Sequence, residues 1–274
     1  MLFDALIDKI TSKIQLWDHR LLSFGGRITL IQSVLSTLPF YNLQVLKMPI
    51  QVRDRIFKLF NKFLWSKSPW CSWHKMCKPY EEGGLNFRAL DDIFTASMIK
   101  AWYRLREGKR TWSKFMLAKY CKLRHPSIAK VLNPHSRLWK NLTGVRDIAE
   151  QHITWGIGKG DCDFFLDSWL PSGPINENAK RGICISEFWR NGDWDNQKLL
   201  LNVSSSQLQE ITSLKIHLDS EDCILWKLSN NSDFTFKSAW ELIRRHQELS
   251  SLYGLIWHSS IPKKSVFYGL ENAT

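Results

Sequence analysis

Three side chains of the types that bind zinc stand close together in the first third of the chain: Cys71, His74 and Cys77. Thiolate and imidazole groups are the usual zinc ligands, and the C-x-x-H-x-x-C spacing keeps these three within reach of one another. A closed zinc site needs a fourth ligand, and no paired Cys/His motif lies near. We therefore interpret the cysteines as small buried side chains and expect no metal here.

Two other patterns suggest catalysis at first sight. Asp91 and Asp92 are adjacent, as are the aspartates that hold two metal ions in polymerases. Ala89, however, stands where that polymerase motif carries an aromatic residue, and acidic residues are favoured at a helix start in any case. The glycine turn at 81–85 lacks the spacing of a phosphate-binding loop. The sequence therefore predicts no catalytic residue, no cofactor and no small-molecule substrate.

Basic side chains at helical spacing are the stronger signal. Arg55, Lys58 and Lys62 recur three and four residues apart in a helix expected over about 51–65, so they share one face. With Arg53 and Arg27 they make five candidates for contact with nucleic-acid phosphates. An ordinary solvated helix face would show the same spacing, so both interpretations stay open.

The net charge of +12 is unevenly distributed over the 274 residues. Residues 1–140 carry 25 Lys and Arg against 9 Asp and Glu, or +16, whereas residues 141–274 carry 13 against 17, or −4. This split indicates a first half that faces a polyanion, and nucleic acid is the commonest one. A membrane surface is the weaker interpretation, because the basic residues alternate with aromatic ones and no apolar run approaches the ~18 residues that span a bilayer.

The six cysteines are scattered without a C-x-x-C motif. Asp4 and Asp8 stand where a signal peptide would carry positive charge. We expect reduced thiols in a nuclear or cytoplasmic protein that is not secreted.

The candidates lie in a region of helical apolar spacing. The stretch WDHRLLSFGGRITLIQSVLSTLPFY, residues 17–41, predicts two helices that meet at Gly25-Gly26, with Ser23 capping the second and Pro39 ending it. A short extended piece is expected at 41–47. Further helices are expected at 51–65, from Asp91 or Asp92 to 106, at 112–120 and from Asn133-Pro134 onward.

After residue 150 the apolar period changes. Alternation at 153–157 and 162–166 around Gly158-Lys159-Gly160 predicts a β-hairpin. A second hairpin is expected at 223–227 and 233–236, and helices at 203–215, with Ser206 and Gln209 as a capping box, and at 238–247. The predicted fold is mainly α: a basic helical region over 1–150 and a smaller α+β region with two hairpins over 151–274.

Five blocks, in order, resemble one family. Residues 17–41, FNKFLWSK, WHKMCKPYEEGGLNFRAL, ITWGIGKGDCDFFLDSWLP, and DFTFKSAWELI with LIWHSSIPKKSVFYGL are similar to segments of plant LINE-type (non-LTR) retrotransposon reverse transcriptases. In the fourth block Gly158, Gly160, Phe165, Asp167 and Trp169 match the family pattern. Asn86 and Tyr80 depart from it, where the family usually has Gly and Lys.

The resemblance covers the thumb and connection region up to the start of the C-terminal zinc-binding region. It implies that the catalytic palm motifs would lie before Met1 and the zinc ligands after Leu270, so the chain looks truncated at both ends. The implied role is non-catalytic contact with RNA or an RNA–DNA hybrid. Two alternatives stay open: a decayed remnant without a selected activity, and a part of an RNA-directed DNA polymerase that is active only with flanking domains.

Overall fold

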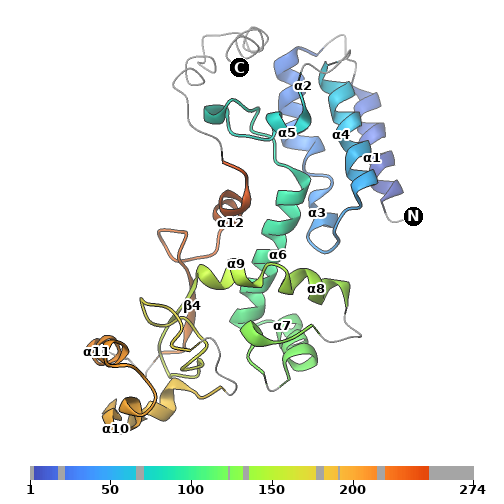
Figure 1. Ribbon diagram of the computed structural model, residues 1–274. Helices are drawn as coiled ribbons and strands as arrows, with labels where there is room; N and C mark the ends of the chain where they lie inside the picture. Colours follow the sequence, from blue (N-terminus) through green and yellow to red (C-terminus); the bar gives the residue numbers. More distant parts are fainter. Residues whose placement is uncertain are drawn as a thin grey trace. The chain divides into compact units, whose positions relative to one another are not determined.

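The computed structural model describes residues 3–17, 22–65, 71–122, 124–131, 136–176, 182–190, 192–214 and 220–246. The chain divides into two compact units (Figure 1). Unit 1 comprises 1–97 and 242–274, and unit 2 comprises 98–241. The boundary expected near residue 150 was drawn from charge and apolar period, and it stays a prediction. The expected helix start at Asn133-Pro134 and the segment from Gln247 onward lie outside the described residues.

Unit 1 begins with two helices, but they do not meet at Gly25-Gly26 as predicted, because both glycines lie in the first turn of the second helix. The elements of this part are α1 (Asp4–Leu16), α2 (Phe24–Leu30), a single π-helical turn at Ile31–Leu35, and α3 (Phe40–Leu43). Ser23 caps α2 as predicted, because its hydroxyl accepts a hydrogen bond of 3.1 Å from the Gly26 N–H. The extended piece predicted at 41–47 is wrong at its start: after Pro39 the chain makes the helical turn α3, with Pro39 at the N-cap.

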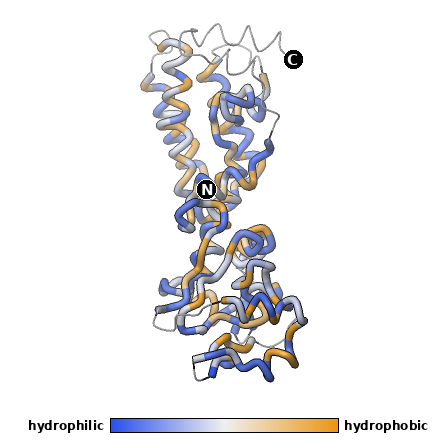
Figure 2. Tube along the Cα trace, turned by 90° about the vertical axis from the view of Figure 1, so that its left-hand side faces the viewer, coloured by the Kyte–Doolittle hydropathy of each residue, from blue (hydrophilic) through white to orange (hydrophobic). Residues whose placement is uncertain are grey.

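The long helix α4 (Ile50–Trp65) confirms the predicted helix and supplies much of the core of unit 1. It is followed by α5 (Trp73–Met76), a 3₁₀ turn (Tyr80–Glu82) and the start of α6 (Leu90–Glu107). The Trp73 ring stacks on Phe57 and Phe87, with ring centroids 5.5 and 5.1 Å apart. These contacts bury one side of α4. Figure 2 shows hydrophilic and hydrophobic residues alternating along the helices, as helices with one buried side require.

A buried ion pair closes unit 1. Arg244 donates through Nη1 and Nη2 to the two carboxylate oxygens of Glu82, at 2.8 and 2.7 Å. Both side chains are less than a tenth exposed. The turn that carries Glu82 is tight, because Gly83 has φ of +78° and a Cβ on Gly84 would lie 2.1 Å from the Lys78 carbonyl oxygen.

Unit 2 continues with the rest of α6 and several short helices. These are α7 (Thr111–Met116), a π-helical turn η3 (Leu117–Cys121), a 3₁₀ turn (Pro126–Ile128), α8 (Arg137–Thr143) and α9 (Arg146–Gln151). The single helix expected through residues 138–148 is thus two helices, α8 and α9, separated at Gly144 and Val145. Trp102 on α6 and Trp139 on α8 are fully buried, with ring centroids 6.4 Å apart.

The first predicted hairpin is wrong, because its first strand pairs with a distant segment and not with residues 162–166. Strand β1 (Ile153–Gly156) is present, but it pairs antiparallel with β4 (Cys223–Trp226), from Ile153 opposite Trp226 to Gly156 opposite Cys223. Residues 162–166 instead run beside 183–185, where Phe164 N–H donates to the Ile183 carbonyl at 2.7 Å. Alternation indicates a strand but does not specify its partner, so a distant segment can take that place.

The second predicted hairpin is also wrong, for the same reason. Strand β4 pairs with β1, residues 233–235 form no strand, and the chain enters α12 (Phe236–Ile243) instead. Thr235 begins this helix by accepting the Ser238 N–H at 3.1 Å. The expected turn at 230–232 is confirmed.

The remaining part of unit 2 packs around an aromatic cluster. Its elements are a 3₁₀ turn (Ile185–Phe188), the hairpin β2 (Trp189–Arg190) and β3 (Asp193–Trp194), α10 (Asn196–Leu200) and α11 (Ser205–Ser213). The capping box of α11 is Ser204 and Gln207, two residues before the predicted pair. The fold class is confirmed: mainly α, with two small antiparallel sheets in the C-terminal half.

Gly158, two residues after the end of β1, has no room for a side chain. A Cβ there would lie 2.1 Å from the Ser220 carbonyl oxygen. Gly158→Ala should therefore lower the Tm of the full chain by several degrees, because backbone must move. Gly144→Ala is the matched control, since Gly144 has φ of −69° and its Cβ would find ordinary contacts at 3.4 Å. Equal Tm values for the two variants in differential scanning calorimetry would contradict this packing.

Candidate nucleic-acid interface

The outer face of α4 carries a row of three basic side chains. Arg55, Lys58 and Lys62 are exposed, whereas Ile56 and Phe60 on the same helix are buried. Residues three and four apart project from the same side of a helix, so the three cations form one row, named here the α4 row. The α4 row is about 10 Å long, from the rise of 1.5 Å per residue.

Arg53 does not belong to this row. Its guanidinium lies 2.6 Å from an oxygen of Asp91 and 3.1 Å from an oxygen of Asp54. It also lies over the Phe57 ring, 5.9 Å from the centroid. The two carboxylates compete with any phosphate for Arg53, so this side chain primarily joins α4 to the first turn of α6.

Arg27 is likewise directed toward the protein. It is half-buried on α2, and its Nη1 donates to the Leu64 carbonyl at 3.2 Å, at the C-terminal end of α4. Cations near a helix C-terminus pair favourably with its last carbonyl groups. Of the five predicted contacts, the structure thus groups three on one exposed face and gives two a place in the packing of unit 1.

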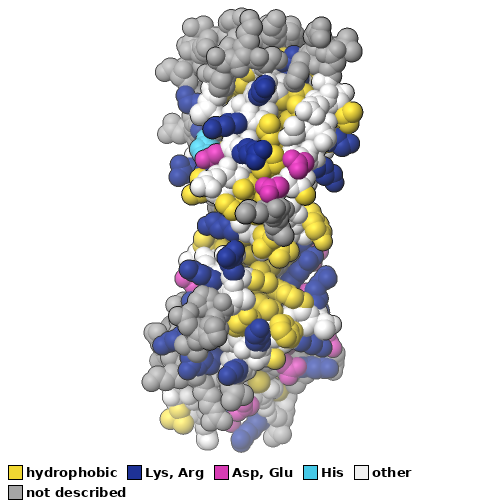
Figure 3. Space-filling model, turned by 90° about the vertical axis from the view of Figure 1, so that its right-hand side faces the viewer, with side chains coloured by type: hydrophobic (Ala, Val, Ile, Leu, Met, Phe, Trp, Pro, Cys, Tyr) yellow, Lys and Arg dark blue, Asp and Glu magenta, His cyan; other side chains and the backbone are white. Residues whose placement is uncertain are grey.

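Helix α1 lies beside α4 in unit 1. The two helices run in the same direction, since Asp4 interacts with Arg55 at one end and the Trp17 ring lies 5.5 Å from Phe63 at the other. The side of α1 next to the α4 row carries Asp4, Thr11 and Gln15, whereas exposed Lys9 and Lys13 project from another side of the helix. In the upper part of Figure 3, which shows unit 1, Lys and Arg side chains lie on the face in view with fewer acidic side chains among them.

Unit 2 contains a buried cluster of charged side chains that the sequence analysis did not identify. The Arg106 guanidinium contacts Asp167 through Nη2, and its Nε lies 2.8 Å from Glu150 Oε1. His125 Nε2 lies 3.1 Å from Asp167, and the Trp102 indole N–H donates to Glu150 at 2.8 Å. A signal was available: Arg106 follows Trp102 by four residues, on the buried side of α6.

The electrostatics of this cluster depend on Arg106. Burial by itself would raise the pKa of the Asp167 carboxyl, but the Arg106 guanidinium and the His125 ring beside it outweigh burial and hold that pKa well below its usual range. The second Asp167 oxygen accepts the Asp163 N–H at 2.8 Å. Asp167 is therefore ionised at neutral pH, and both of its carboxylate oxygens hold neighbouring segments of unit 2.

The Gly158-Lys159-Gly160 turn binds a carboxylate of the protein itself. Asp222, just before β4, accepts the N–H groups of Gly158 and Gly160 at 2.7 and 2.9 Å and that of Cys162 at 2.8 Å. Burial raises the pKa of Asp222, but these three donors outweigh it and lower that pKa overall. Converging amides of this kind bind anions in many proteins. Here the anion is Asp222, so the three converging amides already bind a carboxylate of the protein.

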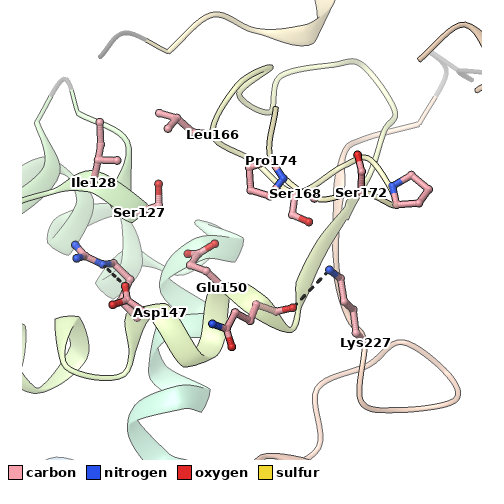
Figure 4. Close-up of a pocket in the computed structure, with 13 residues that line it drawn as sticks. Ser127, Ile128, Asp147, Glu150, Leu166, Ser168, Ser172, Pro174 and Lys227 are labelled. Carbon is pink, nitrogen blue, oxygen red and sulfur yellow. Dashed lines mark hydrogen bonds and ion pairs between the residues drawn. The ribbon is translucent and has the colours of Figure 1, made fainter. Parts of the chain in front are cut away.

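A polar hollow of about 430 Å³ lies between α9, the 168–174 loop and Lys227 (Figure 4). Its charged residues pair with their neighbours: Arg146 lies 3.1 Å from Asp147, and Lys227 Nζ donates to the Gln151 carbonyl at 3.5 Å. Glu150 points toward it but binds Trp102 and Arg106. These groups do not converge on one point as the groups of an acid–base site do.

The residues with zinc-type spacing lie on and beside α5. His74 is exposed, and burial raises the pKa of the Cys77 thiol, which favours the neutral form. Within the described ranges, no three His, Cys, Asp or Glu side chains come together as ligands of a metal ion would. A membrane-crossing helix is also missing from the described part of the chain.

The buried pair of Arg106 and Asp167 should cost far more to break than the exposed pair of Arg53 and Asp91. Asp167→Asn removes one of the two carboxylates that neutralise the buried Arg106 guanidinium. We therefore expect the free energy of unfolding to fall by about 3–5 kcal/mol. Asp91→Asn, at a half-exposed pair, should cost less than about 1 kcal/mol. Urea unfolding followed by tryptophan fluorescence measures both. Similar costs would mean that the cluster does not hold unit 2 together.

Protonation of Asp167 at low pH should remove its contribution to the stability of the fold. Because its pKa in the folded state is lowered, the stabilisation is complete above the unfolded pKa of about 4 and is lost as pH falls toward the folded value. The Tm difference between the native chain and Asp167→Asn should therefore be large at pH 7 and shrink below about pH 4. The corresponding difference for Asp91→Asn should stay small throughout. A Tm difference for Asp167→Asn that is constant with pH would refute this assignment.

No family model matches the chain. Over an alignment of 287 residues that covers 96% of the chain, it is 25% identical to an Arabidopsis thaliana protein named "Putative ribonuclease H protein At1g65750". The alignment covers 46% of that protein, so the chain spans about half the length of the curated relative it matches. The chain is therefore distantly similar to a plant protein whose name refers to ribonuclease H.

Proposed function

We propose that the chain is a retroelement-related protein that holds nucleic acid without catalysing a reaction by itself. The α4 row carries the proposal. Arg55, Lys58 and Lys62 are exposed cations on one rigid helix, and they belong to a first half with a charge of +16. The LINE-type sequence blocks and the distant plant relative support the same class of partner.

The partner we propose is the phosphate backbone of RNA or of an RNA–DNA hybrid. The α4 row is about 10 Å long, so its three cations can lie along neighbouring phosphates of one strand. Each cation can then neutralise one phosphate without reading a base. Arg27 and Arg53 act indirectly, because they fix the two ends of α4 and so keep the row straight.

Filter binding of a 20-base-pair RNA–DNA hybrid over a range of salt concentrations tests the α4 row. Replacing Arg55, Lys58 and Lys62 together by alanine should weaken binding at least tenfold at low salt. The slope of log K against log salt should fall by up to roughly three, since each phosphate contact contributes about 0.9.

The control removes the same charge outside α4, by replacing exposed Lys47, Lys75 and Lys237 with alanine. It should reduce affinity much less. Equal losses of affinity in the two triple variants would mean that binding depends on net charge and not on the position of the α4 row. No retention of the hybrid by the native chain, even at low salt, would refute the proposal.

The enzymatic alternative has a separate readout. Primer extension and hybrid cleavage with Mg²⁺ should give no product with this chain alone, because the resemblance assigns it no catalytic residue. Magnesium-dependent product from the purified chain would overturn the non-catalytic part of the proposal. Cooperative thermal unfolding, in turn, would argue against a decayed remnant that no longer folds.

A further inference from the structure

The basic surplus of the first half is concentrated in unit 2. Residues 98–140 carry 12 Lys and Arg and one acidic residue, Glu107, or +11. Residues 1–97 carry 13 Lys and Arg and 8 Asp and Glu, or +5. The strongest positive potential should therefore surround the helices that follow α6.

Helix α7 and the turn η3 present one continuous exposed stripe. The exposed positions recur at spacings of three and four: Thr111, Lys114, Phe115, Ala118 and Lys119; exposed Lys122 follows directly after η3, where the backbone turns with φ of +51°. The opposite side is held in the core of unit 2 by buried Ser113, Met116 and Cys121. The Ser113 hydroxyl donates to the Arg104 carbonyl at 2.7 Å, which fixes the helix against α6. The stripe is thus a rigid surface with two lysines and one aromatic ring.

Phe115 is the unusual member of this stripe. Its side chain is 59% exposed, and the Lys119 Nζ lies 5.6 Å from its ring centroid and 5.2 Å from that of Tyr120. A large apolar ring in water forgoes the stabilisation that burial would give it. In the lower part of Figure 3, apolar side chains on the surface of unit 2 are bordered by Lys and Arg.

A neighbouring hollow of about 670 Å³ does not compete for the same partner. Its lining includes four Lys and Arg side chains but six carboxylates, those of Glu107, Asp161, Asp163, Asp167, Glu221 and Asp222. A polyanion would be repelled from that interior. The favourable path for a nucleic-acid strand runs along the outside of α7 and η3.

We propose that α7 and η3 form a binding platform for single-stranded nucleic acid, with one base stacked on the Phe115 ring. Lys114, Lys119 and Lys122 then contact the phosphates on either side of that base. Stacking on an exposed aromatic ring needs an unpaired base, since the bases of a duplex already stack on one another. The platform does not depend on the α4 row, which contacts only the backbone.

Fluorescence anisotropy with labelled 12-nucleotide oligo-U and oligo-dT tests the platform. Phe115→Ala should weaken single-strand binding by roughly 5- to 150-fold, the range for loss of one base–aromatic stack. Phe115→Trp should preserve or tighten binding, whereas Phe115→Leu, which is apolar but has no aromatic face, should lose affinity as alanine does. The two oligonucleotides distinguish RNA from DNA as the ligand.

The salt dependence separates stacking from charge. Phe115→Ala should leave the slope of log K against log salt unchanged, whereas Lys119→Ala should lower it by roughly 0.7. Tyr41→Ala removes an aromatic ring that is 80% exposed in unit 1 and serves as the matched control, with no expected effect. Retention of a hybrid duplex should be unaffected by Phe115→Ala, so failure of the α4 row and failure of the platform give different results.

Two outcomes would overturn the platform. Full binding by Phe115→Ala, with native circular dichroism, would show that no base stacks on this ring. Full binding by Phe115→Leu together with loss in Phe115→Ala would indicate a general apolar contact, as in docking of another protein, and not a base.

Discussion

The ion pair of Arg106 with Asp167 is the constraint on which unit 2 depends. Arg106 ends α6, Glu150 ends α9, and Asp167 lies in the loop after β1, so one guanidinium joins three separate segments. Charged groups are costly to bury unless they are paired and hydrogen-bonded. Once Arg106 is on the buried side of α6, both carboxylates must therefore come to it. The positions of α9 and of the loop follow from that requirement.

The glycine-rich blocks serve the same kind of structural purpose. Gly158 and Gly160 allow their N–H groups to converge on Asp222, and this contact places the start of β4 beside β1. In unit 1, Gly84 allows the tight turn that presents Glu82 to Arg244. Each block thus supplies a site where a buried carboxylate is satisfied.

On the surface of unit 1, a charged side chain is solvated by water and does not need an ion-pair partner. Arg53 and Arg27 bind carboxylate or carbonyl groups, whereas Arg55, Lys58 and Lys62 project outward from the same region of unit 1. Charge alone does not distinguish these two kinds of cation. Their partners decide, and both proposals here rest on side chains that are exposed on well-packed helices.

The sequence by itself determined the fold class, the helices α4 and α6, the Ser23 cap and the basic character of the first half. These features depend on local spacing and composition, which a linear pattern records directly. Only the tertiary structure decided that β1 pairs with β4, that Asp222 fills the Gly158-Lys159-Gly160 turn, and that Arg106 is buried. Each of these joins residues roughly 60 or more positions apart. Alternation and charge show that a segment needs a partner, but the choice of partner depends on packing the whole chain around it.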